Sequence, residues 1–307
     1  MALSAQRLGP VRTRLRVREP PPQLYFVISA VFHYLGPSFA VLLFTRVEVL
    51  GVAWMRIAAA ALVLGVWRRP WRIWVSLDRD ARRLLLGWGA LLALMNCCFY
   101  EAIAKLPLGT VAAIEFLPVI ALAALGARTT RNAAALVLAV AGVYLLTHVR
   151  LTLQPLGLAF AFANAALFAT YIVLAHRVAR LSAVGGIDGL AAAMVIALVV
   201  VTPLGGLQAA RALSDPVALL AGAGVGISSS VIPYVTDQLA MVRLSRATYS
   251  LMVALLPATA TVVGIVVLTQ IPSAAELAGV GVVVFAVAVH RDPGEPVEAL
   301  HTPLLEE

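Results

Sequence analysis

Charge is scarce in this sequence, and so are the motifs on which soluble enzymes depend. Of the 307 residues, 12% are charged, against roughly 25% in globular domains. The two cysteines, Cys97 and Cys98, are adjacent, so they are unsuited to bridging each other, and no histidine stands near them to complete a metal site. No P-loop, His-Glu-x-x-His or Gly-x-Ser-x-Gly motif occurs. The sequence therefore predicts no enzyme, no metal site and no cofactor.

Apolar residues are abundant instead. They make up 62% of the chain, and the mean hydropathy of +0.95 exceeds what a soluble core can hide, so we expect the bilayer to be the solvent. Ten apolar runs have the length of roughly 17 to 25 residues that a spanning helix needs. They cover 24–45, 49–67, 84–104, 107–127, 132–148, 156–176, 187–205, 217–241, 247–270 and 274–290. The predicted fold class is an all-α membrane protein with ten transmembrane helices.

The basic residues indicate how these helices are oriented. With a cytoplasmic N-terminus, the inside segments carry 18 basic residues and the outside segments carry 4, and an excess of basic residues marks the cytoplasmic side. Both termini are then cytoplasmic, with a basic leader at 1–23 and a tail at 291–307. A transit peptide is the alternative for the leader, but Pro10 and the prolines at 20–22 oppose its amphipathic helix. The net charge of +8 thus reflects topology, and we expect no nucleic-acid partner.

An internal repeat divides the chain in two. The same shift of 139 residues relates Pro118 to Pro257 and Gly142 to Gly281, and it carries the fourth predicted helix onto the ninth and the fifth onto the tenth. The two units are then 24–148 and 156–290, with five helices each. An odd number of crossings puts the second unit in the membrane upside down. Inverted repeats of this kind surround a central site in many secondary transporters.

Ionisable residues inside apolar runs are the strongest indication of a site, because a charge at membrane depth is costly. Arg56 and Glu115 lie at similar depths, about 10 and 12 Å from the outer side. Two interpretations are open: Arg56 binds a substrate carboxylate while Glu115 takes an amino group or a proton, or the two form a structural ion pair. Asp237 is a second proton-coupling candidate, and an ion pair with Arg243 or Arg246 is the alternative for it. Glu101 and Lys105 are spaced for a salt bridge at the rim of a helix.

Aromatic residues and prolines complete the predicted site. His33 and Tyr34 in the first helix could line a cavity. The alternative for His33 is a histidine whose hydrogen bonds are satisfied within the protein, and for the other aromatic candidates it is core packing. Proline frees backbone carbonyls by removing a helical hydrogen bond, and such carbonyls suit a cation. The further aromatic candidates are Tyr100, Phe116, Tyr171 and Tyr234, and the predicted kinks are at Pro37, Pro118, Pro233 and Pro257. Gly222, Gly224 and Gly226 are expected to serve close helix packing, and tryptophans 67, 71, 74 and 88 an interfacial belt.

Four stretches of the chain carry a resemblance to a known family. They are VAWMRIAAAALVLGVWRRPWR at 52–72, LMNCCFYEAIAKLPLGTVAAIEFLPVIALAAL at 94–125, FATYIVLAHRVA at 168–179 and SSVIPYVTDQLAMVRLSRATYSLMVALLPA at 229–258. In these stretches the chain resembles the EamA-type ten-helix class of the drug/metabolite transporter superfamily. Within this class it most resembles the bacterial threonine/homoserine exporter family. The family's functional positions fall on Arg56, on Glu115 with Phe116, and on Asp237, where glutamate is commoner.

The resemblance implies a secondary transporter in the bacterial cytoplasmic membrane. It would export a small zwitterionic metabolite, such as threonine or homoserine, by proton antiport and alternating access. The chain departs from the family pattern at Leu117, at Thr269–Gln270 and at His33–Tyr34, which bears on the identity of the substrate. A transporter of drugs, nucleobases or nucleotide sugars and a structural membrane protein without transport remain alternatives. The oligomeric state, including a homodimer, is left open.

Overall fold

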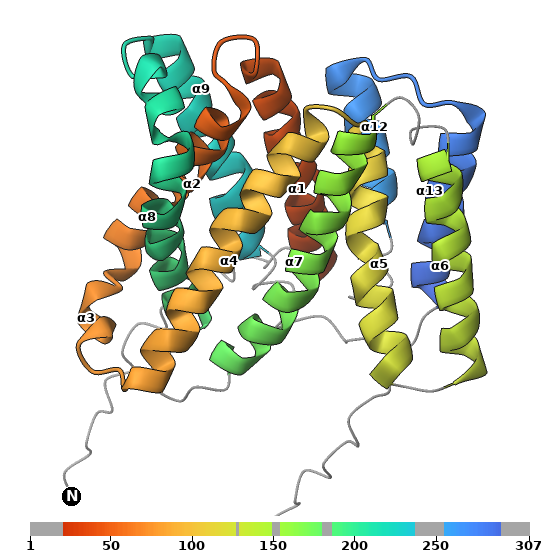
Figure 1. Cartoon of the computed structure of the whole chain (residues 1–307), viewed down its shortest axis with the longest axis horizontal. Coiled ribbons are helices and arrows are strands. Elements are labelled where there is room, and N and C mark those ends of the chain that lie inside the picture. The colour runs from red at the N-terminus through yellow and green to blue at the C-terminus, as the bar shows by residue number, and fades with distance from the viewer. Residues whose placement is uncertain (1–20, 127–128, 149–153, 180–185, 237–254, 290–307) are drawn as a thin grey trace, which may run out of the picture.

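Every regular element in the described part of the chain is a helix (Figure 1). The computed structural model describes residues 21–126, 129–148, 154–179, 186–236 and 255–289. Asp237, a predicted site residue, lies outside these ranges. The elements are α1 Pro22–Leu43, α2 Val49–Arg68, α3 Trp71–Trp74, α4 Arg79–Ile103, α5 Leu108–Gly126, α6 Thr130–His148, α7 Pro155–Ala179, α8 Gly186–Ala212, α9 Pro216–Gly226, the π-helix η1 Ile227–Val231, α12 Leu256–Leu268 and α13 Ala274–Val289.

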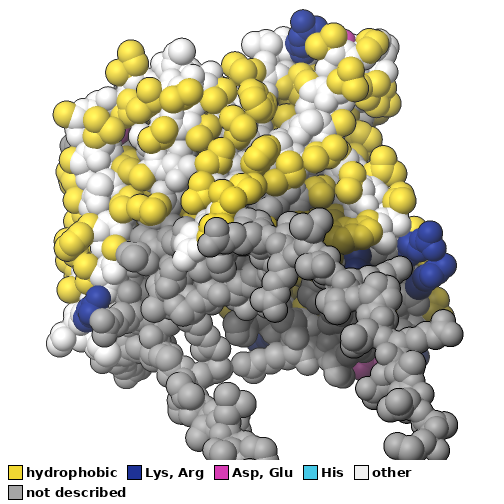
Figure 2. All heavy atoms as spheres, turned by 180° about the vertical axis from the view of Figure 1, so that it is seen from behind, with side chains coloured by type: hydrophobic (Ala, Val, Ile, Leu, Met, Phe, Trp, Pro, Cys, Tyr) yellow, Lys and Arg dark blue, Asp and Glu magenta, His cyan; other side chains and the backbone are white. Residues whose placement is uncertain are grey.

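The helices form where the sequence is continuously apolar, and their outer surface is apolar as well. Five of them are long and apolar enough to cross a membrane: Gln23–Leu43, Val49–Arg68, Arg79–Ile103, Ile187–Ala212 and the continuous helical stretch Pro216–Thr236. The other helices α5, α6, α7, α12 and α13 contain shorter apolar stretches. Figure 2 shows hydrophobic side chains over most of the described surface on one face, with Lys and Arg side chains near its margins. The described residues therefore form an all-helical protein with the apolar outer surface that a membrane protein needs.

Eight of the helical segments make a closed ring. Each contacts the next in the order α2, α9 with η1, α1, α12, α5, α7, α4 and α8, and α8 returns to α2. The pair α6 and α13 stands outside this ring and contacts α5, at the right of Figure 1. Side chains that point into the ring from different helices can therefore meet at one place.

Helices α2 and α8 run antiparallel and are joined by ion pairs at both ends. At one end, Glu48 before α2 accepts a hydrogen bond of 3.1 Å from Arg211 near the end of α8. At the other end, Arg68 in the last turn of α2 pairs with Asp188 in the first turn of α8 at 2.5 Å. Because these contacts join opposite ends of the two helices, their directions are opposed.

Three details differ from the expectation. The segment 68–83 contains a short helix, α3, and α4 begins at Arg79 because Asp78 caps it by accepting a hydrogen bond of 2.8 Å from the Ala81 N–H. The predicted helix 187–205 continues to Ala212 through Pro203. Trp88 is buried rather than interfacial, since its side chain packs beside Tyr171 in the core.

Candidate functional site

Arg56 is the buried cation of the ring. It lies in the middle of α2, and only 7% of it is exposed. Its Nε donates a hydrogen bond of 3.0 Å to the hydroxyl of Ser230, and its Nη2 donates one of 3.0 Å to the backbone carbonyl of Ser229. Both partners belong to η1 and are uncharged. The guanidinium is thus held in place while its positive charge is not neutralised by these contacts.

The local sequence explains why a carbonyl is ready to accept from Arg56. Pro233 has no N–H, so it cannot donate to the carbonyl four residues earlier, which is that of Ser229. The turn before it is a π-helix, in which the N–H of Ile232 bonds to the carbonyl of Ile227. Gly226 lets this segment approach α2, because a Cβ there would lie 2.7 Å from the Arg56 carbonyl oxygen. Sequence and local geometry together therefore bring η1 against Arg56.

Two buried phenols belong to the same ring of helices, and one of them lies close to this cation. Tyr34 of α1 and Tyr100 of α4 are both fully buried. The Tyr34 hydroxyl has no hydrogen-bond partner, whereas the Tyr100 hydroxyl lies beside Arg56 and Ser229. The Arg56 guanidinium lies 5.5 Å from the centre of the Tyr100 ring, a cation–π contact. Buried polar atoms are nearly always hydrogen-bonded in folded proteins. The unpartnered hydroxyl of Tyr34 therefore points to a ligand or to water.

Glu115 provides the opposite charge from the other side of the ring. It lies in α5 and is 8% exposed, and its Oε1 accepts a hydrogen bond of 3.1 Å from the Asn164 amide of α7. The Asn164 Oδ1 is buried without a partner. Glu115 is within electrostatic reach of both Arg56 and Tyr34. No ion pair joins Arg56 and Glu115 in the described part of the chain, so the interpretation as a structural ion pair loses its basis here.

The remaining aromatic candidates divide between the site and the core. His33 lies edge-on to Tyr34, with ring centroids 5.2 Å apart, and Phe116 is buried next to Glu115. Tyr171 instead stacks on Phe168 at 6.0 Å and lies against Trp88, and Tyr234 also packs on the core cluster around α4 and α8. Core packing therefore accounts for the two later tyrosines.

The predicted prolines have different surroundings. Pro37 and Pro118 lie inside α1 and α5, as expected. Pro233 follows η1, where its effect on the Ser229 carbonyl is visible. Pro257 lies in the first turn of α12, a position that needs no N–H, so it begins this helix rather than interrupting it.

Two further predictions concern the rim and the glycines. The salt bridge between Lys105 and Glu101 is confirmed at 2.7 Å. Gly222 and Gly226 do serve close packing, against Met55 and Ala59 of α2. At Gly224, however, an added Cβ would meet nothing within 4 Å.

The site also contains residues that the sequence did not single out. These are Ser229, Ser230 and Asn164. A signal existed for each: three consecutive serines precede Pro233 in an apolar segment, and Asn164 is an amide in the middle of the apolar run 156–176. Serine hydroxyls and asparagine amides often donate to carbonyls of their own helix, so neither signal is specific. The bonds from Ser229 Oγ to the Val225 carbonyl and from Asn96 Nδ2 to the Leu92 carbonyl are examples.

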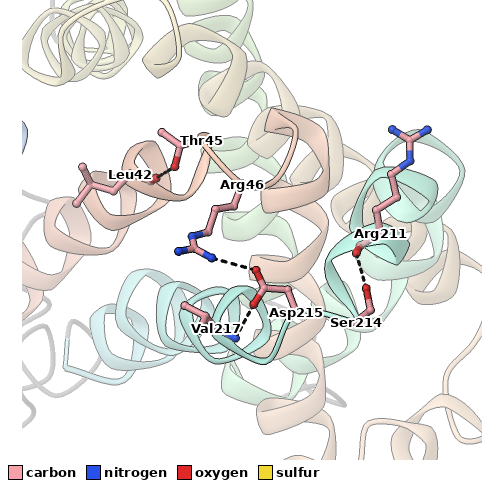
Figure 3. Close-up of polar contacts among 7 residues, drawn as sticks. All are labelled: Leu42, Thr45, Arg46, Arg211, Ser214, Asp215 and Val217. Atoms are coloured by element: carbon pink, nitrogen blue, oxygen red, sulfur yellow. Dashed lines mark hydrogen bonds and ion pairs between the residues drawn. The ribbon is translucent and has the colours of Figure 1, made fainter.

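A groove lies between α1 and α9 on the outside of the ring. It has a volume of about 410 Å³ and is lined mainly by apolar side chains, with Arg46 at one end and Ser228 at the other. Ser228 immediately precedes the serines that hold Arg56. At the Arg46 end, the guanidinium points to Asp215 at the start of α9, 3.2 Å away (Figure 3).

Comparison with known proteins gives close relatives but no matching family model. The threonine/homoserine exporter RhtA of Escherichia coli (strain K12) is 32% identical over 258 residues, which are 82% of this chain and 84% of the relative. RhtA of Salmonella typhimurium (strain SL1344) is 32% identical over 256 residues, covering 81% and 84%. A crystal structure with 18% identity matches the fold with a TM-score of 0.53 over 87% of this chain and 97% of the other. The latter likeness concerns the fold alone.

Proposed function

Because this chain belongs to the family of the threonine/homoserine exporter RhtA, among the EamA-type drug/metabolite transporters, we propose that it exports small zwitterionic amino acids in exchange for protons. Membership of this family makes it a multi-pass membrane transporter and not an enzyme. Threonine and homoserine, which the names of the relatives give, are the first substrates to test.

The observation that carries the proposal is the separation of two buried charges. Arg56 is bound by Ser229 and Ser230, and Glu115 by Asn164, so each charged group has only uncharged hydrogen-bond partners among the described residues. An unpaired buried charge is expensive. A zwitterion supplies both missing charges at once, with its carboxylate at Arg56 and its ammonium group at Glu115.

The same arrangement supports proton coupling. A carboxyl group that binds a proton no longer attracts an ammonium group, so proton and substrate compete for Glu115. Competition at one buried group is the physical basis of an antiport cycle, in which the site empties toward one side and reloads with the other species. We assign Glu115 this role and keep Asp237, which lies outside the described residues, as a second coupling group.

Packing between the halves supports alternating access by inverted repeats. In the proposed repeat of 24–148 and 156–290, α4 corresponds to α9 with η1, and α1 corresponds to α7. The contact between α4 and α7 therefore has a counterpart in the contact of α9 and η1 with α1, and both contacts are present. Helices α2 and α8, which correspond under the same exchange, are antiparallel. A two-fold relation of this kind gives one central site two equivalent routes, one to each side. We propose ten spans with both termini in the cytoplasm of a bacterium.

The test is transport by the purified full chain in liposomes. Vesicles loaded with radiolabelled threonine or homoserine should release it faster when a pH gradient is imposed. Arg56→Ala and Glu115→Gln should each lower this proton-driven efflux by about tenfold to a hundredfold, since each removes a charge-assisted hydrogen bond to substrate. Arg83→Ala is the control, because 78% of that side chain is exposed. Efflux at the normal rate in either site variant would remove that residue from the site.

A further inference from the structure

Hydrogen-bond donors and acceptors are segregated across the ring. On the side of α2 and α4, the groups are donors: the guanidinium of Arg56 and the hydroxyl of Tyr100. On the side of α5 and α7, they are acceptors: the carboxylate of Glu115 and the Oδ1 of Asn164. A ligand that bridges the two sides must therefore accept hydrogen bonds at one end and donate them at the other.

Asn164 is the least explained member of this set. It is fully buried in α7, and its Nδ2 donates to Glu115 at 3.1 Å, while its Oδ1 has no partner. The bond to a carboxylate fixes the amide orientation, because only the nitrogen can donate. A buried acceptor without a donor costs about 1 to 3 kcal/mol. A side chain needed only to support Glu115 would not have to carry that cost.

We propose that Asn164 is a substrate ligand, and that its Oδ1 and the Glu115 carboxylate together bind the ammonium group of the transported amino acid. An ammonium group has three N–H donors and no acceptor, so it requires several acceptors in one place. Glu115 supplies the charge and one or two acceptors, and Asn164 supplies another. The bond from Asn164 to Glu115 also fixes the position of the carboxylate. The same amide therefore positions the charged group with its nitrogen and binds the ammonium group with its oxygen.

A hydroxyl ligand fits this end of the site less well than an ammonium group. A hydroxyl has one hydrogen to donate, so it cannot bond to Glu115 and Asn164 together. It would also leave the charge of Glu115 without a counter-charge in the described residues. The hydroxyls of Tyr34 and Tyr100 can each donate a hydrogen bond, and they suit the carboxylate or a hydroxyl of the same ligand.

The inference rests on the proposed function, and ligands that differ by one group can test it separately. The three ligands are homoserine, 4-hydroxybutyrate, which lacks the amino group, and 3-aminopropan-1-ol, which lacks the carboxylate. Their affinities for the purified full chain are measured by competition with radiolabelled homoserine. Asn164→Leu should weaken binding of the two amines by about tenfold to a hundredfold and leave 4-hydroxybutyrate unchanged. Asn164→Ala should give the same pattern if the leucine variant does not fold.

A buried asparagine away from the ring provides the control. Asn132 of α6 is 1% exposed, and Asn132→Leu should leave all three affinities as in the wild type. Equal weakening of all three ligands by Asn164→Leu would make Asn164 a structural residue and overturn the inference, as would no weakening at all. A wild-type protein that binds none of the three would overturn the proposed function, and the inference with it.

Discussion

Arg46, in the connection after α1, and Asp215, which caps α9, form an ion pair of 3.2 Å across the two halves of the molecule (Figure 3). The side chains are 56% and 36% exposed, so the pair is at the surface. The connection before α2 is tied to the end of α8 by a second pair, Glu48 with Arg211 at 3.1 Å. Two short connections, one from each half, are therefore joined at one end of the bundle.

Removal of the charge of Asp215 should have an effect that depends on pH. The pKa of Asp215 is held below its usual value. The largest cause is a hydrogen bond from the backbone N–H of Ala218, and the backbone N–H of Val217 and the nearby Arg46 act in the same direction. A carboxylate with a lowered pKa stabilises the folded state above the pKa of the unfolded chain, and this contribution is lost as the pH falls through the folded pKa. Asp215→Asn keeps the capping ability and removes the charge.

The measurement is the difference in Tm between wild type and Asp215→Asn as a function of pH. The wild type should melt higher by a constant amount above about pH 5, and the difference should shrink as the pH falls below about 4, the ordinary pKa of an aspartate. Other titrating groups are shared by both proteins and cancel in the difference. A difference that grows on acidification would contradict this account of Asp215.

Gly36 of α1 should not tolerate a methyl group. A Cβ at this position would lie 2.4 Å from the Ser229 Cβ and 2.8 Å from the Ser229 backbone nitrogen, so α1 and η1 would have to separate. Overpacking of this kind costs about 1 to 3 kcal/mol. Gly36→Ala should therefore lower Tm by a few degrees, and it should also lower transport, because the Ser229 carbonyl binds Arg56.

Gly224→Ala is the matched control for this variant. It is also a glycine in a helix, but an added Cβ meets nothing within 4 Å, and alanine is favoured over glycine by about 1 kcal/mol in a helix. Its Tm should be equal to that of the wild type or higher. Equal losses in both variants would show that the close approach of Gly36 to Ser229 is not what limits stability.

The ion pair between Arg68 and Asp188 should be energetically coupled, unlike an exposed pair on α4. Its side chains are 35% and 25% exposed, against 78% and 89% for Arg83 and Asp80. A double-mutant cycle with Arg68→Gln and Asp188→Asn should give a coupling free energy of about 0.5 to 1 kcal/mol. The cycle on Arg83 and Asp80 should give a value near zero. Similar coupling free energies in the two cycles would show that the ion pair of Arg68 and Asp188 does not stabilise the packing of α2 against α8.

The sequence predicts the helices and the two central charges because both follow from hydropathy. Apolar runs locate the helices, and an arginine or glutamate inside such a run has few places to go other than a polar interior. Arg56 and Glu115 are both buried in the ring as that reasoning requires. The inverted repeat, the orientation and the proton-coupling roles stay predictions.

The partners of these charges could not be predicted, because they depend on three-dimensional packing. Ser229 becomes a partner of Arg56 only when a π-turn, Pro233 and Gly226 act together. Tyr171 and Tyr100 were equivalent candidates for the site in the sequence, but the Tyr171 ring packs against Trp88 in the core. The repeat relates Gly142 to Gly281, but it gives no indication of the tight contact that Gly142 makes with Gly279.

The π-turn in Ile227–Val231 also makes the length of this segment significant. An α-helix has 3.6 residues per turn, so the one residue accommodated by a wider turn rotates everything after it by about 100°. Gly222 and Gly226, before the π-turn, can then pack against α2, while the residues from the π-turn to Thr236 present a differently rotated face of the same helix to their neighbours. Deleting a single residue here would restore an unbroken α-helix and turn a different side chain toward Arg56, even if the composition of the segment stayed the same.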